Sequence, residues 1–182
     1  MSKTLILTAI GKDRPGIVAA VAKVLFETGG NIEDSSMTRL GNDFAMILML
    51  TMPAKNSTTL LDKKLSAAGK KLGLSITLRQ LSPAELKPAK ADDSLPHLIS
   101  VYGADKPGIV FKIADFLADR KANITDVETK IISPKTNPVY VMMLEVEIPK
   151  KANIAHLTAE LDRLSQDLSV DINLKPIESY QL

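Results

Sequence analysis

Residues 10–18 read IGKDRPGIV, and residues 102–110 read YGADKPGIV. Six of these nine positions are identical, at a spacing of 92 residues (102 − 10 = 92). At the same spacing, residues 31–34 (NIED) return as residues 123–126 (NITD). Self-similarity over such a distance indicates that one structural unit occurs twice. The sequence therefore predicts two similar domains in one chain.

A stretch of linker composition separates the two copies. Residues 82–94 (SPAELKPAKADDS) contain two prolines and three alanines, without apolar periodicity. We therefore expect domain 1 over residues 1–81, a linker over 82–95 and domain 2 over 96–182. In the second copy a four-residue insertion around residues 133–138 increases the spacing from 92 to 96.

The apolar pattern of each copy predicts the element order β-α-β-β-α-β. The first strand is apolar on both faces of its pleat, as in the centre of a sheet, and Ile17, Val21 and Leu25 form one stripe on the first helix. Gly41-Asn42-Asp43 predicts a tight hairpin. We therefore expect an α+β fold of two ferredoxin-like βαββαβ domains, each a four-stranded antiparallel sheet with two helices on one face. In the first copy the expected strands are Thr4–Ile10, Ile32–Leu40, Phe44–Met52 and Leu74–Leu81, and the second helix begins near Ser57.

The third strand of the first copy is apolar on both faces. An exposed apolar face of this size needs a cover, either the other repeat or another subunit, so a homodimer is one arrangement that fits. The alternative is a central strand in a thick core. One face carries Phe44, Met46, Leu48, Leu50 and Met52, and the other carries Ala45, Ile47, Met49 and Thr51.

The turn between the first strand and the first helix carries the densest chemical signal. Pro15 has a fixed φ that suits the first position of a helix, so we expect the helix to begin at Pro15. The backbone N–H groups of Gly16 and Ile17 then have no helical partner, and Gly16 has no side chain to block an approaching group. Such a helix end attracts a carboxylate.

An ammonium group near this helix end would need an acceptor, and Asp13, Asp34 or the amide of Asn31 could provide it. Together these groups would hold the two ends of an amino-acid zwitterion. In the alternative, Asp13 caps the helix and Asn31 serves only the turn after Gly29-Gly30. The residues alone leave both interpretations open.

The segments 13–18 (DRPGIV) and 30–35 (GNIEDS), followed by Leu40-Gly41 and Phe44, resemble the ACT domain, a small ligand-sensing βαββαβ module. The resemblance covers nearly the whole chain. It implies that a small amino acid binds where the first loop of one domain meets its partner. The implied ligand-binding residues are Asp13, Arg14, Gly16, Ile17, Asn31 and Ile32 in domain 1, and Asp105, Gly108, Ile109, Asn123 and Ile124 in domain 2.

Domain 2 departs from the motif at several of these places. Lys106 replaces Arg14, residues 121–122 (KA) replace the two glycines at 29–30, and Thr125 takes the place of Glu33. We therefore prefer the first of the two implied sites.

The resemblance implies a non-enzymatic, amino-acid-sensing regulator. A chain of two such domains without a catalytic domain is similar to the ACT proteins that act as glycine-responsive transcriptional repressors of the glycine cleavage system. Their implied mode of action is protein–protein contact with a DNA-binding activator, without direct contact with nucleic acid. The alternative is an ACT-type regulatory subunit that binds and controls an enzyme of amino-acid or nitrogen metabolism.

The composition argues against several other classes of protein. The 182 residues include 23 Lys and Arg and 21 Asp and Glu, a formal net charge of +2, which gives little affinity for nucleic acid. The chain has no cysteine, and its two histidines lie far apart in the sequence. We therefore expect no disulfide, no metal site and no cofactor. The sequence groups no Ser, His and acidic residue as a catalytic triad would, and it has no phosphate-binding loop. It therefore gives no indication of an enzyme. No apolar run approaches the ~20 residues of a membrane span, so we expect a soluble cytoplasmic protein with no membrane contact.

Overall fold

The structure is a computed structural model that describes residues 2–86, 93–132 and 138–177. Its contacts divide the chain into two compact units, Met1–Pro88 and Ala89–Leu182. The boundary between these units falls inside the predicted linker, residues 82–95. The first residues of that linker form a turn in which the Glu85 carboxylate accepts hydrogen bonds from Ser82 and Arg79.

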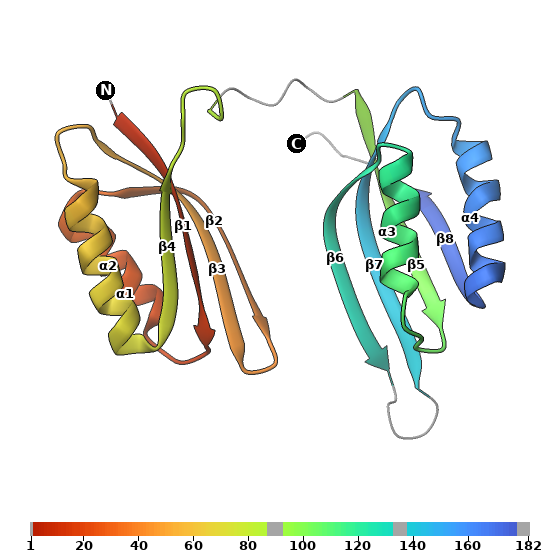
Figure 1. The fold of residues 1–182 in the computed structure, drawn as a ribbon, viewed down its shortest axis with the longest axis horizontal. Helices are drawn as coiled ribbons and strands as arrows, with labels where there is room; N and C mark the ends of the chain where they lie inside the picture. Colours follow the sequence, from red (N-terminus) through yellow and green to blue (C-terminus); the bar gives the residue numbers. More distant parts are fainter. Residues whose placement is uncertain (1, 87–92, 133–137, 178–182) are drawn as a thin grey trace. The chain divides into compact units, whose positions relative to one another are not determined.

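The first unit has one antiparallel sheet and two helices, as predicted. The strand order is β2-β3-β1-β4, so β1 and β3 lie in the centre. Both helices lie on the same face of this sheet (Figure 1). The elements are β1 (Ser2–Lys12), α1 (Ile17–Thr28), β2 (Asn31–Leu40), β3 (Asp43–Pro53), α2 (Thr58–Leu72) and β4 (Leu74–Gln80).

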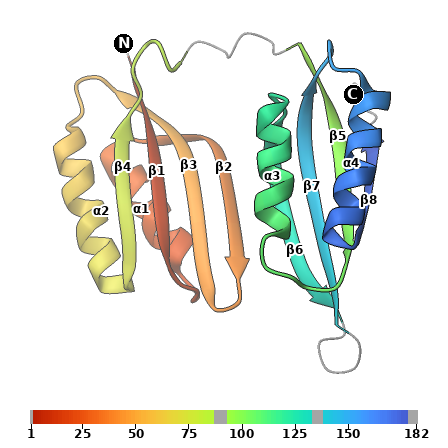
Figure 2. The same ribbon diagram turned by 45° about the vertical axis from the view of Figure 1, so that its right-hand side comes forward.

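The second unit repeats this plan. Its strand order is β6-β7-β5-β8, and its two helices again cover one face of the sheet (Figure 2). The predicted insertion lies between β6 and β7, and residues 133–137 of it are outside the described part. The elements are β5 (Ser94–Gly103), α3 (Ile109–Asp119), β6 (Asn123–Ile132), β7 (Val139–Pro149), α4 (Ile154–Leu168) and β8 (Val170–Pro176). The predicted α+β fold with two ferredoxin-like units is confirmed.

Each unit has its own hydrophobic core between the sheet and the helices. The two clusters of buried side chains share no residue. Equivalent positions carry the cores: α1 buries Ile17, Val21 and Leu25, and α3 buries Ile109, Ile113 and Leu117.

The helix-free face of the first sheet is open. Ile47 and Met49 on this face of β3 are 47% and 36% exposed. The thick-core interpretation of β3 is therefore wrong for the described residues, whereas the opposite face of β3 is buried as predicted.

The β2–β3 hairpin sets the register of the sheet edge. Leu40 pairs with Asp43, so the turn consists of Gly41 and Asn42. Gly41 has a φ of +61°, which a glycine at the first central position of a hairpin turn accepts without steric cost. The register pairs Arg39 with Phe44 and thus places both near the end of β1.

Candidate functional site

The β1–α1 turn is formed by Pro15 and Gly16. Gly16 has φ 94° and ψ −5°, the values of the third residue of a type II turn, which favours Pro in the position before it. Helix α1 therefore begins at Ile17, and the prediction that it begins at Pro15 is wrong. Gly108 has φ 95° and ψ −6°, so the second copy makes the same turn.

No described side chain caps the N-terminus of α1. The Asp13 carboxylate instead faces Arg39, with 3.6 Å between Oδ2 and Nη1. The Asp13 N–H donates to the carbonyl oxygen of Asn42 at 2.8 Å. The interpretation in which Asp13 caps the helix is therefore wrong. An ideal Cβ at Gly16 would meet nothing within 4 Å, so the space on the side-chain side of Gly16 is open.

A hollow of about 800 Å³ lies beside this helix end. Val18, Met37 and Phe44 make part of its lining apolar, while Asp13 and Arg39 bring opposite charges. The complete lining is Asp13, Arg14, Pro15, Gly16, Val18, Ala19, Met37, Thr38, Arg39 and Phe44.

The sequence interpretation missed Met37, Thr38 and Arg39 as residues of this hollow. They lie on β2, about twenty residues after the turn in the chain, and only the strand register brings them to it. The hairpin at residues 41–42 was the available signal, because it pairs the end of β2 with the start of β3.

Arg14 contacts the end of helix α2. Its guanidinium Nη2 donates to the carbonyl oxygen of Lys71 at 3.0 Å. In the second copy Lys106 makes the equivalent contact, since its Nζ donates to the carbonyl oxygen of Leu168 at the end of α4, at 3.4 Å. A cation is favourable there, because the last carbonyl groups of a helix have no helical partner and carry partial negative charge. In both domains this basic residue ties the turn to the second helix.

Asn31 and Ile32 lie at the opposite end of the sheet from the turn. Asn31 pairs with Thr51, which pairs with Thr4, whereas Lys12 adjoins the turn. The eight residues from Thr4 to Lys12 span about 26 Å. Asn123 and Ile124 are separated from Asp105, Gly108 and Ile109 in the same way. Within one domain the structure therefore does not bring the two predicted groups of residues together.

The Asn31 side chain is engaged locally. Its Nδ2 donates to Glu33 Oε1 at 2.9 Å, and Thr51 Oγ1 donates to the same oxygen at 2.6 Å. These hydrogen bonds hold the pKa of the Glu33 carboxyl below its usual value, and the bond from Thr51 has the larger effect. Thr125 takes the place of Glu33 in the second copy, so this carboxylate is present only in domain 1.

The turn of the second copy has different neighbours. Ile131 pairs with Tyr140, as Arg39 pairs with Phe44, so Asp105 has no counterpart of Arg39. Burial, and then the negative charge of Asp105, raises the pKa of Tyr140. Among the residues that the structure describes, the pair of opposite charges at the turn is found in domain 1.

Among the described residues, no group of three or more His, Asp or Glu side chains could hold a metal ion. His97 is buried, with its Nδ1 3.0 Å from the carbonyl oxygen of Leu95. Within the same ranges no helix is long and apolar enough to cross a membrane.

A family model described as the ACT domain matches residues 3–79 and again residues 96–175. The chain belongs to the ACT domain family. Its two ACT domains lie in tandem and correspond to the two units of the fold.

Relatives of this tandem ACT protein include a named regulator. This chain is 26% identical over 179 residues to the glycine cleavage system transcriptional repressor of Escherichia coli (strain K12). The matched region covers 97% of this chain and 92% of that protein. This chain is also 41% identical over 76 residues to a UPF0237 protein from Methanocaldococcus jannaschii, covering 41% of this chain and 84% of that protein. The crystal structure of an unknown protein from Galdieria sulphuraria matches with a TM-score of 0.81 and 28% identity, over 98% of this chain and 100% of that one. The family and the first relative support a regulatory role.

Proposed function

We propose that this tandem ACT protein is an amino-acid-responsive repressor of the glycine cleavage system, with glycine as its favoured ligand. It acts in the cytoplasm through contact with a DNA-binding activator protein and does not bind DNA itself. The observation that carries this proposal is similarity over 97% of the chain to a protein named as that repressor. The near-balanced charge of the chain agrees with a partner other than nucleic acid.

The ligand site of this proposal is the β1–α1 turn of domain 1. The ligand carboxylate accepts hydrogen bonds from the N–H groups of Gly16 and Ile17, where no described side chain competes. Its ammonium contacts the Asp13 carboxylate. Asp13 can be recruited at small cost, because its pair with Arg39 is long and exposed, and such pairs contribute little stability.

Asn31 and Ile32 enter this proposal only as residues of a second half-site. They lie about 26 Å from the turn of their own domain, so one small ligand cannot contact both groups there. The same holds for Asn123 and Ile124 relative to Asp105 and Gly108.

The size of glycine limits the affinity of such a site. The best small ligands gain about 1.5 kcal/mol per non-hydrogen atom, so the five of glycine give at most about 7.5 kcal/mol. This corresponds to a Kd no tighter than about micromolar. An affinity in this range suits a sensor of metabolite concentration.

A reporter for the glycine cleavage promoter tests the proposed function in cells with and without the gene for this protein. We expect promoter activity to fall when the protein is present, and the extent of repression to change with added glycine. Affinity purification should recover the DNA-binding activator of that promoter, and the purified protein alone should not shift promoter DNA. Unchanged promoter activity, together with recovery of a metabolic enzyme, would favour the enzyme-subunit alternative.

A further inference from the structure

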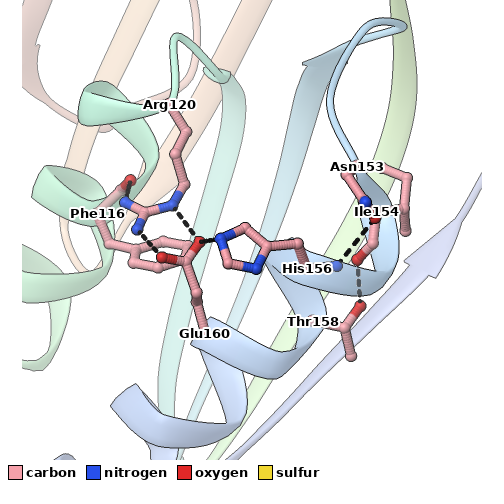
Figure 3. A network of polar contacts seen from close by, with 7 residues as sticks. All are labelled: Phe116, Arg120, Asn153, Ile154, His156, Thr158 and Glu160. Carbon is pink, nitrogen blue, oxygen red and sulfur yellow. Dashed lines mark hydrogen bonds and ion pairs between the residues drawn. The ribbon is translucent and has the colours of Figure 1, made fainter.

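Each domain has an ion pair between its two helices, and the two pairs have opposite polarity. In domain 1 the acid is on the first helix: Glu27 of α1 accepts a hydrogen bond from Lys64 of α2 at 2.9 Å. In domain 2 the base is on the first helix: Arg120, at the end of α3, donates to both carboxylate oxygens of Glu160 on α4, at 2.8 and 3.0 Å (Figure 3).

Lys64 and Glu160 occupy equivalent positions in the repeat. They are 96 residues apart and precede the equivalent buried leucines Leu65 and Leu161. On the first helix, Glu27 corresponds to Asp119, the neighbour of Arg120, at the spacing of 92.

The apolar contacts of the helices distinguish the two domains poorly. Three buried helix positions carry leucine in both copies: Leu25 and Leu117, Leu61 and Leu157, and Leu65 and Leu161. A helix from one domain would therefore present nearly the same apolar stripe to the sheet of the other.

The pair in domain 2 is held firmly. Arg120 Nη1 also donates to the carbonyl oxygen of Phe116 at 2.8 Å, and the guanidinium lies 3.7 Å from the centre of the Phe116 ring. The Arg120 and Glu160 side chains are 30% and 25% exposed, so solvent screens this pair only in part. His156 Nε2 lies 3.6 Å from Glu160 Oε2. Figure 3 shows the His156 and Arg120 side chains on the same carboxylate.

We propose that the opposite polarity of these ion pairs keeps the helices of the two domains from exchanging partners during folding. Proteins with similar domains in one chain misassemble by such exchange, within a chain or between two copies. With α1 packed against α4, Glu27 would lie beside Glu160 without Arg120. With α3 packed against α2, Arg120 would lie beside Lys64, although Asp119 would offset part of this repulsion. Lys23, which lies 4.0 Å from Glu27, would likewise offset part of the repulsion between α1 and α4.

Exchanging the charges within one domain tests this proposal. The double variant Glu27→Lys/Lys64→Glu keeps an ion pair in domain 1 but gives it the polarity of domain 2. The double variant Arg120→Glu/Glu160→Arg keeps an ion pair in domain 2 but gives it the polarity of domain 1. The combination of all four substitutions restores opposite polarity. Each protein is unfolded in denaturant, refolded by dilution at several concentrations and separated by size-exclusion chromatography.

We expect each double variant to yield about two- to five-fold less native monomer than the wild type at micromolar concentration, with more dimer or misfolded chain. The quadruple variant should recover the wild-type yield. High salt should reduce the difference, because it screens the charges. Lys23 lies 4.0 Å from Glu27, so the Glu27→Lys substitution also adds a repulsion within α1. The equilibrium unfolding midpoints of the same proteins show how much stability each variant loses from this and other causes. Wild-type yields for both double variants, or no recovery in the quadruple variant, would overturn the proposal.

Discussion

Gly16 is the residue on which the geometry of the β1–α1 turn depends. Its φ of 94° lies in the region that L side chains rarely adopt, although a Cβ there would meet no atom within 4 Å. Any side chain at this position is therefore strained by the backbone and not by its neighbours.

We expect Gly16→Ala to lower the free energy of unfolding of domain 1 by roughly 1–2 kcal/mol. Chemical denaturation measures this change. Gly30→Ala is the matched control, because Gly30 has no positive φ and its Cβ would meet ordinary contacts of 3.5 Å or more. Equal losses for the two variants would contradict the assigned role of Gly16.

Arg14 provides a second test at the level of a single residue. Its contact with the carbonyl oxygen of Lys71 needs only a positive charge, since Lys106 makes the equivalent contact in domain 2. We therefore expect Arg14→Lys to preserve stability and Arg14→Met to lose about 0.3–1 kcal/mol, measured by denaturation. If Arg14→Lys is as damaging as Arg14→Met, the guanidinium has a role that an ammonium group cannot fill.

At the level of elements, the ion pair between α3 and α4 makes domain 2 sensitive to acid. The hydrogen bonds from Arg120 hold the pKa of the Glu160 carboxyl below its usual value of 4.5. A carboxyl whose pKa is lower in the folded state stabilises that state above its unfolded pKa. This contribution is lost as the pH falls through the folded value.

We expect Glu160→Gln to unfold more readily than the wild type at pH 7, with a difference that shrinks as the pH falls below about 4.5. Urea unfolding followed over a series of pH values measures this effect. Glu145→Gln, on the exposed face of β7, is the control for the loss of one negative charge. A difference that is constant over the whole pH range would show that Glu160 does not act through its ionised form.

The elements themselves were largely predictable from the sequence. Nearly continuous apolar runs located β1 and β3. Ser57 marked the start of α2, where its Oγ accepts a hydrogen bond from the Leu60 N–H. The start of α1 was not predicted, because Pro15 fits two positions, the first residue of a helix or the second residue of a turn. The positive φ of Gly16 selects the turn.

The candidate site was harder to predict than the elements. The motif identified Asp13 and Gly16, which lie at the hollow. It could not identify Arg39, because the contact of Arg39 with Asp13 depends on the register across three strands. For the same reason it grouped Asn31 with Asp13, although the two lie at opposite ends of one sheet.

For the whole molecule, two cores without a shared residue predict two separate unfolding units. The tyrosines make this testable, because the chain has no Trp and its three Tyr, at positions 102, 140 and 180, all belong to the second unit. Tyrosine fluorescence therefore monitors the second unit, whereas circular dichroism monitors both.

We expect Leu50→Ala, at a fully buried position of the first core, to cost about 2–5 kcal/mol. It should shift part of the circular-dichroism transition and leave the tyrosine transition in place. Leu161→Ala in the second core should shift the tyrosine transition. Equal displacement of both signals by Leu50→Ala would show that the two units unfold as one.

The central claim is that the uncapped turn of domain 1 binds a small amino acid, and calorimetric titration of the purified protein with each of the twenty amino acids tests it most directly. We expect glycine to release or absorb heat with a Kd of about micromolar or weaker. Asp13→Asn should abolish this signal, and Asp105→Asn should retain it. No heat with any amino acid, or an unchanged titration of Asp13→Asn, would contradict the claim.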